Sequence, residues 1–331
     1  MQRQQQLTTW LQSQFPSEIF NLTPASADAS FRRYFRAGYA DRTLIVMDAP
    51  PEHEDCRSFL HVARLFENAG VHVPHIYAKN LEQGFLLLSD LGNTTYLQAL
   101  TTENARTLYT DATNALIKIQ LASKEDELPC YDEALLLREM RLFPEWYINK
   151  HLNITLTPAQ NTKLETVFAR IVANNLSQPR VYVHRDYHSR NLMVTEPNPG
   201  IIDFQDAVYG PISYDLVSLF KDAYIKWDES QIIDHLIGYW QNARRAGLPV
   251  HEDFGQFYWD FEWMGAQRHL KVLGIFARLC YRDGKEGYLK DMPLVMSYLR
   301  ATAARYVDLK PLLNLLNELE PPLEAPTGYG F

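Results

Sequence analysis

The sequence feature that most limits how this chain can fold is a polar segment, followed closely by a short apolar segment that contains one aspartate. Residues 184–191 have the sequence HRDYHSRN, and residues 201–204 have the sequence IIDF. Phosphoryl transfer requires mainly an aligned acceptor hydroxyl and a Mg²⁺ ion that neutralises charge. The pattern therefore indicates Asp186 as the base that accepts the hydroxyl proton. It indicates Asn191 and Asp203 as oxygen ligands of Mg²⁺.

The residues around these side chains predict short strands that bring them together. The β-branched and aromatic run 180–183 predicts a strand that ends near Asp186. After the polar loop, 192–194 and 201–202 predict two further short strands separated by a turn rich in proline, asparagine and glycine. A buried ion pair or a turn cap that includes His184 is the alternative for an isolated HxD pattern. The combination of HxDxxxxN, hairpin and IDF favours a catalytic site.

Composition sets broader limits on this chain. Its 331 residues are 46% hydrophobic, which is sufficient for one large domain or two modest ones. A formal net charge of −8 argues against a nucleic-acid or anionic-membrane surface as the main partner. The three cysteines are far apart and form no CxxC pair, which favours a reducing cytoplasm over a zinc or disulfide framework. We expect a small-molecule substrate, no secretion signal, no membrane span, and a monomer.

Hydrophobic periodicity predicts an α+β fold with a β-rich first part. Strands are expected at 29–36, 43–47 and 84–88, with helices at 7–15 and 56–69. After residue 92 the pattern becomes mostly helical, so we expect a small first domain, 1–91, and a large helical domain, 92–331. Helices of the second domain are expected at 105–121, 131–150, 158–174, 231–246, 254–281 and 293–306, with a weakly ordered tail at 320–331.

This order of elements, together with HxDxxxxN and IDF, resembles the aminoglycoside phosphotransferase family of kinase-like enzymes. The resemblance covers nearly the whole chain and is most specific from residue 181 to residue 219. It implies a protein-kinase-like fold of two lobes, a small β-rich lobe and a large helical lobe, with ATP and Mg²⁺ as cofactors. The family roles map Asp186 to the catalytic base, and they map Asn191 and Asp203 to the metal ligands.

Two further residues are expected to support the catalytic loop. In the family pattern an acidic residue at the start of a helix, here Asp215, braces the loop through backbone amides. A carboxylate at this position also suits the dipole of the helix, and the two roles can coexist. His184 ends the predicted strand, so we expect it to support the loop and not to carry a proton.

The nucleotide-binding part departs from the usual kinase pattern. Kinase-like folds place a lysine at the end of a strand and a glutamate on the next helix, but the matching strand, 43–48, contains no lysine, and Phe59 occupies the glutamate position. Either other cations bind the ATP phosphates, or the chain is an inactive binding module. Arg32, Arg33 and Arg36 are candidate phosphate ligands because a guanidinium binds phosphate in bidentate fashion. A charged edge strand is the alternative for these arginines.

The connector that follows the last predicted strand is where the family presents backbone groups to adenine. Ser89, Asp90 and Leu91 are therefore candidate nucleotide contacts. Asp90 has a second expected role, as the cap of the next helix. Residues 25–30, which lack a GxGxxG motif, would form the tip of the nucleotide-covering hairpin.

Four longer stretches of the chain carry a narrower resemblance: 28–36, 46–51, 85–92 and 265–279. They resemble a group of bacterial amino-sugar kinases that act in cell-wall recycling. That resemblance makes the missing lysine a trait of the group. It implies ATP-dependent phosphorylation of the anomeric hydroxyl of N-acetylmuramic acid or N-acetylglucosamine to the sugar 1-phosphate.

Recognition of the acceptor must come from the helical part. Glu139, Arg141 and Trp146 form a polar and aromatic group in a predicted helix that contains a proline, and Arg268 and Lys271 belong to a basic series in a long helix. The lactyl carboxylate of N-acetylmuramic acid would need such a cation. Each of these residues also has an ordinary role in ion pairs or packing. Choline, homoserine and aminoglycosides are the alternative acceptors, and the basic helix mildly disfavours a cationic one.

Overall fold

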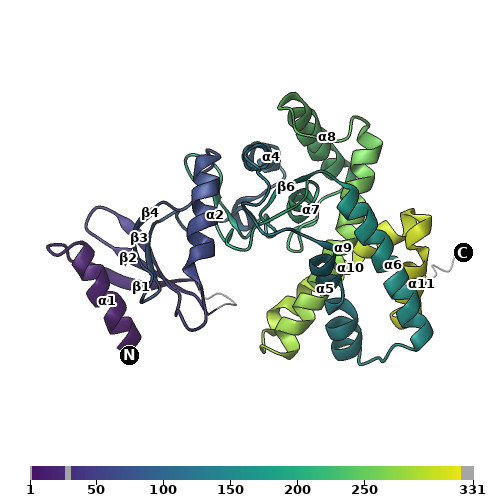
Figure 1. Cartoon of the computed structure of the whole chain (residues 1–331), viewed down its shortest axis with the longest axis horizontal. Helices are drawn as coiled ribbons and strands as arrows, with labels where there is room; N and C mark the ends of the chain where they lie inside the picture. Colours follow the sequence, from purple (N-terminus) through teal and green to yellow (C-terminus); the bar gives the residue numbers. More distant parts are fainter. Residues whose placement is uncertain (1, 27–30, 322–331) are drawn as a thin grey trace, which may run out of the picture. The chain divides into compact units, whose positions relative to one another are not determined.

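The computed structural model describes residues 2–26 and 31–321, and the fold is α+β (Figure 1). The chain forms two compact units. The first unit contains Met1–Ala122 and Ser189–Ala207, and the second contains Ser123–His188 and Val208–Phe331. This division differs from the single boundary at residue 91 that the sequence predicted. The reason is that the segment after the catalytic loop returns to the first unit and pairs with it.

A five-stranded antiparallel sheet, in the order β1-β2-β3-β5-β4, forms the centre of the first unit. Residues 85–88 of β5 are all buried, because this strand lies inside the sheet and both of its faces are covered. The outer strands β1 and β4 were not predicted, since NLTPAS and IYAKN are short and partly polar, as edge strands often are. The strands are β1 (Asn21–Ser26), β2 (Arg33–Gly38), β3 (Thr43–Asp48), β4 (Ile76–Asn80) and β5 (Phe85–Ser89).

Helix α1 (Gln2–Gln14) covers one face of this sheet. Its apolar residues Leu7, Trp10 and Leu11 pack against a buried cluster that includes Val46 and Leu87. This helix begins earlier than the sequence predicted. The prediction of an amphipathic surface helix is otherwise confirmed, since the remaining side chains of α1 are mostly exposed.

Two basic side chains converge on one buried carboxylate at the end of β3. Asp48 is fully buried, and it pairs with Arg3 of α1 at 2.7 Å and with Arg33 of β2. Arg3 also donates a hydrogen bond of 2.7 Å to the carbonyl oxygen of Gln83. Since a buried carboxylate requires such partners, these ion pairs attach α1 to the sheet.

Helix α2 (Cys56–Asn68) confirms the prediction for 56–69. Asp55 caps its first turn by accepting a hydrogen bond from the backbone N–H of Arg57. The helix ends before Gly70, whose φ of +74° is a conformation that glycine adopts without strain. Its buried face presents Phe59, the residue that occupies the expected glutamate position.

The rest of the first unit consists of α3 (Tyr96–Ala99), α4 (Ala105–Leu121) and a small hairpin, β7 (Leu192–Met193) with β8 (Gly200–Ile201). Backbone hydrogen bonds attach this hairpin to earlier segments: Val194 donates to Thr94 O, and Ile201 donates to His72 O, both at 2.8 Å. The predicted strands that flank the Asn191 and Asp203 loops are thus present, and they belong to the sheet-containing unit.

The second unit is mostly helical and is organised around one long helix, α9 (Phe254–Tyr281). Its residues from Phe261 to Lys271 are all buried, so the middle of α9 is surrounded by protein on every side. A two-stranded ladder, β6 (Arg180–Val183) with β9 (Val208–Pro211), completes the unit. The other helices are α5 (Glu133–Met140), η1 (Phe143–His151), α6 (Pro158–Ser177), α7 (Tyr214–Phe220), α8 (Glu229–Arg245), η2 (Glu286–Asp291), α10 (Met292–Arg305), η3 (Val307–Leu309) and α11 (Lys310–Leu319).

Helix boundaries in this unit follow the predictions with two differences. The expected helix 131–150 is divided into α5 and the π-helix η1, because Pro144 lies in the first turn of η1 and cannot donate a backbone hydrogen bond. Helix α11 was not predicted. Most of the predicted tail, 320–331, lies outside the described residues.

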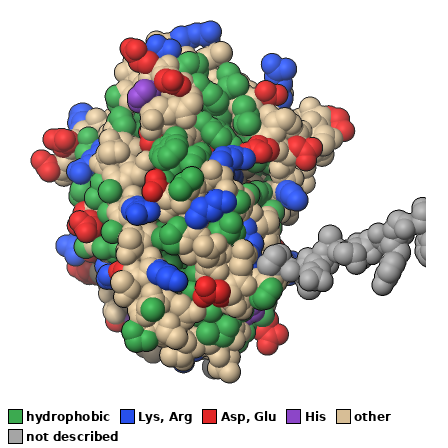
Figure 2. Space-filling model, turned by 90° about the vertical axis from the view of Figure 1, so that its right-hand side faces the viewer, with side chains coloured by type: hydrophobic (Ala, Val, Ile, Leu, Met, Phe, Trp, Pro, Cys, Tyr) green, Lys and Arg blue, Asp and Glu red, His purple; other side chains and the backbone are tan. Residues whose placement is uncertain are grey.

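The described part of the chain contains no helix that is both long and apolar enough to cross a membrane. On the face shown in Figure 2, acidic and basic side chains are interspersed. This distribution provides no broad basic surface on that face for nucleic-acid binding.

Candidate active site

The predicted catalytic loop directly follows β6 in the second unit. Arg185 adopts a left-handed backbone conformation with a φ of +76°. The buried carboxylate of Asp215, at the start of α7, accepts hydrogen bonds from the backbone N–H groups of His184 at 2.7 Å and Arg185 at 3.0 Å. A strained residue persists only where its surroundings hold it, and Asp215 provides part of that restraint. These contacts are of the kind that the expected supporting role of Asp215 requires.

His184 supports the same loop from inside. Its side chain is fully buried, and its Nδ1 accepts a hydrogen bond of 3.2 Å from the backbone N–H of Asp186. Nδ1 is therefore the unprotonated ring nitrogen in this arrangement. A buried histidine with this bond helps to orient the loop backbone.

The carboxylate of Asp186 combines solvent access with nearby positive charge. Its side chain is 41% exposed, and its Oδ1 lies 3.6 Å from Nη2 of Arg268. The loss of hydration at this partly buried position would by itself raise the pKa of Asp186. The positive charges of Lys271 and Arg268 nevertheless hold that pKa well below its usual range. Asp186 is therefore ionised at neutral pH and reachable by an acceptor, as a general base must be.

A buried ionic network lies behind the catalytic loop. Glu139 of α5 pairs with Arg185 and, at 3.1 Å, with Lys271 of α9. It also accepts hydrogen bonds from the Tyr131 hydroxyl and, at 3.1 Å, from the Gln267 amide. Burial would raise the pKa of Glu139, yet Lys271 and Arg185 lower it to about 2. The network thus contains a permanently ionised carboxylate with several partners, which is the condition for burying charge without a large penalty.

Glu139, Arg268 and Lys271, which the sequence suggested as acceptor contacts, lie in the protein interior. All three side chains are about 95% buried, and each is bonded to protein groups. A sequence alone does not distinguish a buried cation in a fully covered helix from a cation on an open face.

Two other predicted acceptor residues lie outside this network. Arg141 pairs with Glu165 of α6 at 2.8 Å, and both side chains are about half exposed. Trp146 is a half-buried residue of η1. The contacts of Arg141 thus attach α5 to α6, and its role toward the acceptor stays a prediction, as does that of Trp146.

In the first unit, Asn191 and Asp203 lie beside one another, as predicted. Nδ2 of Asn191 is 3.2 Å from Oδ2 of Asp203, and Gln205 donates a hydrogen bond of 2.9 Å to Oδ1 of Asp203. Asp203 also has a left-handed φ, +62°. The next residue, Phe204, is buried against Phe59 of α2, with ring centroids 4.9 Å apart, which anchors the Asp203 loop to the unit.

This pair fits a hard divalent cation. One carboxylate and one amide oxygen, with no sulfur or imidazole, are the ligand types that Mg²⁺ prefers. Among the residues that the structure describes, no group of three or more His, Cys, Asp and Glu side chains forms a richer metal site. Mg²⁺ commonly uses one or two protein ligands and completes its shell with phosphate oxygens and water, so a two-residue site is sufficient.

The three candidate phosphate-binding arginines all form ion pairs within the first unit. Arg33 contacts the buried Asp48, and Arg36 contacts Asp90 through two bonds, of 2.5 and 3.0 Å. The third, Arg32, pairs at 2.8 Å with Glu54, which precedes α2, and both side chains are less than 15% exposed.

The connector residues have structural roles of their own. Asp90 does not cap the next helix, contrary to the expectation; Thr95 is the N-cap of α3, and Asp90 instead accepts a hydrogen bond of 2.9 Å from the backbone N–H of Gly92. Ser89 is bonded to His75 through both its N–H and its side-chain oxygen, each at 2.9 Å. The side chain of Leu91 is buried.

Three residues of the network were not predicted as site residues. The Tyr214 hydroxyl bonds Lys271 at 2.9 Å and Arg268 at 3.1 Å, while Tyr131 and Gln267 bond Glu139. Tyr214 directly precedes Asp215, and this adjacency was the available signal. Tyrosines in apolar stretches are more often core residues, which explains why the pattern did not identify them.

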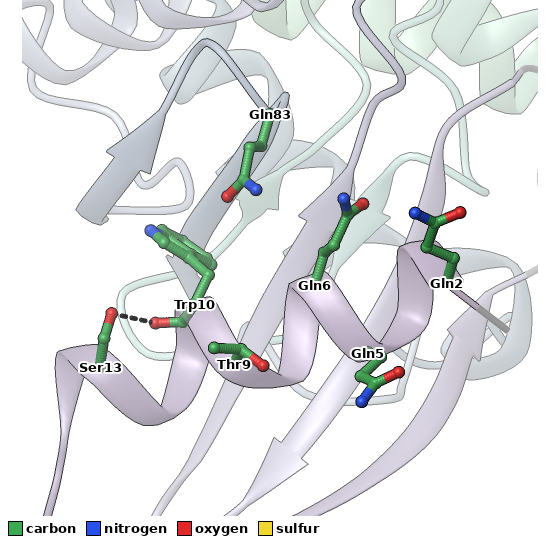
Figure 3. Close-up of a pocket in the computed structure, with 7 residues that line it drawn as sticks. All are labelled: Gln2, Gln5, Gln6, Thr9, Trp10, Ser13 and Gln83. Atoms are coloured by element: carbon green, nitrogen blue, oxygen red, sulfur yellow. Dashed lines mark hydrogen bonds between the residues drawn. The ribbon is translucent and has the colours of Figure 1, made fainter.

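The pocket in Figure 3 belongs to a different part of the first unit. It has a volume of about 480 Å³ and lies between the exposed side of α1 and the turn that contains Gln83. Its lining is uncharged, with glutamine, threonine and serine side chains beside Trp10. Since it contains neither a titratable group nor any predicted site residue, it has no means of phosphoryl transfer.

Comparison with known proteins assigns this chain to a class. The chain belongs to the phosphotransferase enzyme family, whose sequence model matches residues 21–250. The solved structure of the ADP-bound aminoglycoside phosphotransferase APH(2'')-Ib is similar, with a TM-score of 0.59, 15% identity, and coverage of 88% of this chain and 97% of that chain. This likeness confirms the predicted protein-kinase-like α+β fold.

Closer relatives match this chain over nearly its whole length, with almost half of the aligned residues identical. The chain is 49% identical over 336 residues to the N-acetylmuramate/N-acetylglucosamine kinase of Neisseria meningitidis serogroup B, with 100% of both chains covered. It is 48% identical over 329 residues to the protein of the same name from Pseudomonas putida, with 96% of this chain and 97% of that one covered. The predicted resemblance to an amino-sugar kinase group is thereby confirmed.

Proposed function

We propose that this enzyme transfers the γ-phosphoryl group of Mg²⁺–ATP to the anomeric hydroxyl of N-acetylmuramic acid or N-acetylglucosamine. The observation that carries the reaction class is the solvent-accessible Asp186 carboxylate, which lies beside the Arg268 guanidinium and within a restrained loop. The names of relatives that are nearly half identical over their full length support these two sugars as acceptors.

Asp186 accepts the proton of the sugar hydroxyl as its oxygen bonds to the γ-phosphorus. The bond between that phosphorus and the bridging oxygen breaks, and ADP leaves with the electron pair. Asn191 and Asp203 are the residues that would hold Mg²⁺. When bound, Mg²⁺ neutralises the charge of the nucleotide phosphates. The products are ADP and a sugar 1-phosphate.

Among the three candidate arginines, Arg32 is the proposed phosphate ligand. Arg33 and Arg36 neutralise the carboxylates of Asp48 and Asp90, which are 0% and 6% exposed. Removing such a cation from a buried carboxylate costs about 3–5 kcal/mol. If Arg33 left Asp48 to bind a phosphate, Asp48 would still be paired with Arg3. The energetic cost of leaving a buried carboxylate without its arginine therefore applies most directly to Arg36 and its partner Asp90.

Arg32 also has the electrostatic surroundings of a site near the metal pair. Burial would lower the pKa of Arg32, but Tyr34, Glu54 and Asp206 raise it. Asp206 follows Asp203 by three positions in the chain. The Arg32–Glu54 ion pair thus provides a cation and a carboxylate in the unit that lacks the usual lysine and glutamate.

Product analysis tests the proposed reaction. The purified enzyme is incubated with Mg²⁺–ATP and each sugar, ADP release is followed, and the product is examined by phosphorus NMR. We expect a phosphate whose coupling assigns it to the anomeric carbon. Asp186→Asn should lower kcat by about 10²–10⁴-fold with little change in ATP affinity. No turnover with either sugar, or a phosphate on another carbon, would contradict the proposed acceptor chemistry.

The cellular setting is also a proposal. All three cysteines are free thiols, and Cys130 is exposed, which suits a reducing cytoplasm. We infer that the enzyme works there as a monomer. Fractionation of cells and light scattering of the purified enzyme test these two points separately.

A further inference from the structure

We infer that Arg268 is a positioning residue that holds the backbone of the catalytic loop and the Asp186 side chain in place, and that it does not bind the acceptor. This inference rests on the proposed role of Asp186 as the base. It differs from the role that the sequence suggested for Arg268, which was to bind a carboxylate of the sugar.

The guanidinium of Arg268 contacts two consecutive residues of the loop. Its Nη1 donates a hydrogen bond of 2.7 Å to the carbonyl oxygen of Arg185, and its Nη2 lies 3.6 Å from Oδ1 of Asp186. Arg185 is the residue with the left-handed φ of +76°. One planar group therefore restrains the strained residue and the carboxylate that follows it.

Asp215 also restrains Arg185, through the backbone N–H group of Arg185. It accepts a hydrogen bond from the N–H of Arg185, whereas Arg268 donates to the carbonyl oxygen of Arg185. Both partners are nearly fully buried, so water cannot easily replace either bond. Because a left-handed backbone conformation is unfavourable for a non-glycine residue, loss of one restraint allows the loop to relax. Relaxation would move Asp186 away from the acceptor hydroxyl.

The surroundings of Arg268 leave it unsuited to acceptor binding. Its side chain is 6% exposed, its guanidinium lies over the Tyr214 ring at 5.2 Å from the centroid, and its Nη1 bonds the Tyr214 hydroxyl at 3.1 Å. Lys271 shares that hydroxyl and pairs with Glu139. These two cations are thus components of the protein interior.

Several charged groups act on the Asp186 carboxylate. Arg268 and Lys271 come from α9, Arg185 and His188 from the loop, and Asp215 from α7. Removing Arg268 deletes one positive charge and leaves the others in place. The carboxylate should then be harder to ionise, and activity should be lost at a higher pH on the acidic side.

The experiment compares Arg268→Met, Arg268→Lys and a matched control, Arg282→Met. Arg282 is half exposed at the end of the same helix and pairs with the adjacent Asp283. For Arg268→Met we expect kcat to fall by about 10- to 100-fold, since a misplacement of about 1 Å has a cost of this size. The fall should be equal for the two sugars, with little change in the KM for sugar or ATP. Arg282→Met should match the wild type.

The pH profile separates positioning from simple loss of folding. In Arg268→Met the acidic limb of kcat should move to higher pH, whereas Arg268→Lys should keep the limb near its wild-type position while kcat stays reduced. Carbon NMR titration of the Asp186 carboxyl measures the same shift without turnover. The titration therefore remains informative even if neither sugar is a substrate. Absence of turnover with both sugars would contradict the proposed acceptor but not the positioning role of Arg268.

Two results would overturn the inference. An increased KM for N-acetylmuramic acid, with N-acetylglucosamine unaffected, would show that Arg268 binds the lactyl carboxylate. Wild-type kcat and an unshifted Asp186 titration in Arg268→Met would show that the loop needs no restraint from α9. If Arg268→Met fails to fold, the Lys variant still decides the question, because positioning predicts a reduced kcat for both sugars.

Discussion

At the scale of single residues, the site depends on how buried charges are shared. Asp48, Asp90 and Glu139 each have at least one arginine partner, so most charges that look available in the sequence are already paired in the fold. Arg32 differs from the other two candidate arginines because its partner, Glu54, is more exposed (14%) than Asp48 (0%) and Asp90 (6%), and because Asp206 also acts on Arg32. Pairing, more than residue type, therefore distinguishes ligand candidates from structural residues.

Arg32→Met should weaken ATP binding by about 10- to 100-fold, because a hydrogen bond to a charged group contributes about 1.5–3 kcal/mol. Isothermal titration with ATP, ADP and adenosine measures this effect, and adenosine binding should not change. The matched control is Arg33→Met, which removes a charge from a neighbouring position while Asp48 keeps Arg3. Equal losses in both variants, or a loss for adenosine, would exclude a specific phosphate contact by Arg32.

The pKa of Asp215 predicts a pH-dependent contribution to stability. Burial raises this pKa to about 7, although the backbone N–H groups of His184 and Arg185 lower it. Between about pH 4 and 7 the folded state keeps a proton that the unfolded chain loses, so the contribution of Asp215 falls as pH rises. The total change is at most about 4 kcal/mol.

Urea unfolding at several pH values tests this sign. The difference in unfolding free energy between the wild type and Asp215→Asn should decrease as pH increases from 4 to 7, since Asn cannot titrate. A difference that stays constant, or that increases with pH, would show that Asp215 is ionised in the folded protein throughout this pH range.

At the scale of elements, the buried helix α9 organises the second unit. It packs closely on η1: a Cβ added at Gly274 would collide with the backbone carbonyl and side chain of Leu142. Gly238 of α8 has nothing within 4 Å of the same position. Close packing therefore requires glycine at position 274 but not at position 238.

This contrast predicts opposite effects of one substitution. Gly274→Ala should destabilise the protein by about 1–3 kcal/mol, because overpacking forces the two helices apart. Gly238→Ala should stabilise it by up to about 1 kcal/mol through helix propensity. Thermal or urea unfolding measures both changes. A neutral Gly274→Ala would mean that α9 and η1 separate without cost.

Most elements were predictable because their patterns are local. The α4 and α9 boundaries match the prediction, as long periodic segments with clear ends allow. The edge strands β1 and β4 were missed, because a partly polar strand of five or six residues lacks a distinct period. For the site, the Asn191–Asp203 pair followed from spacing, whereas the burial of Arg268 and Lys271 depends on tertiary packing that no local pattern records.

At the scale of the whole molecule, ligand binding should stabilise the folded chain. Mg²⁺–ATP at about 100 times its Kd would add about 2.7 kcal/mol, which raises Tm by a few degrees in a chain of this size. Chelation of Mg²⁺ should remove most of this increase, and Asp203→Asn should do the same in the presence of Mg²⁺. The control is Asp41→Asn, at an exposed turn position. An increase that persists in Asp203→Asn would argue against this aspartate as the metal ligand.

The return of Ser189–Ala207 to the first unit determines how the chain can be divided. A fragment that ends at Ala122 would keep all five strands of the sheet, but it would lack both Asn191 and Asp203. It would also leave the carbonyl groups of His72 and Thr94 without the hydrogen bonds that the β7–β8 segment donates. The segment that carries the metal pair is synthesised after residues 123–188 of the second unit and before residues 208–331. The first unit is therefore completed only after the first part of the second unit has been made.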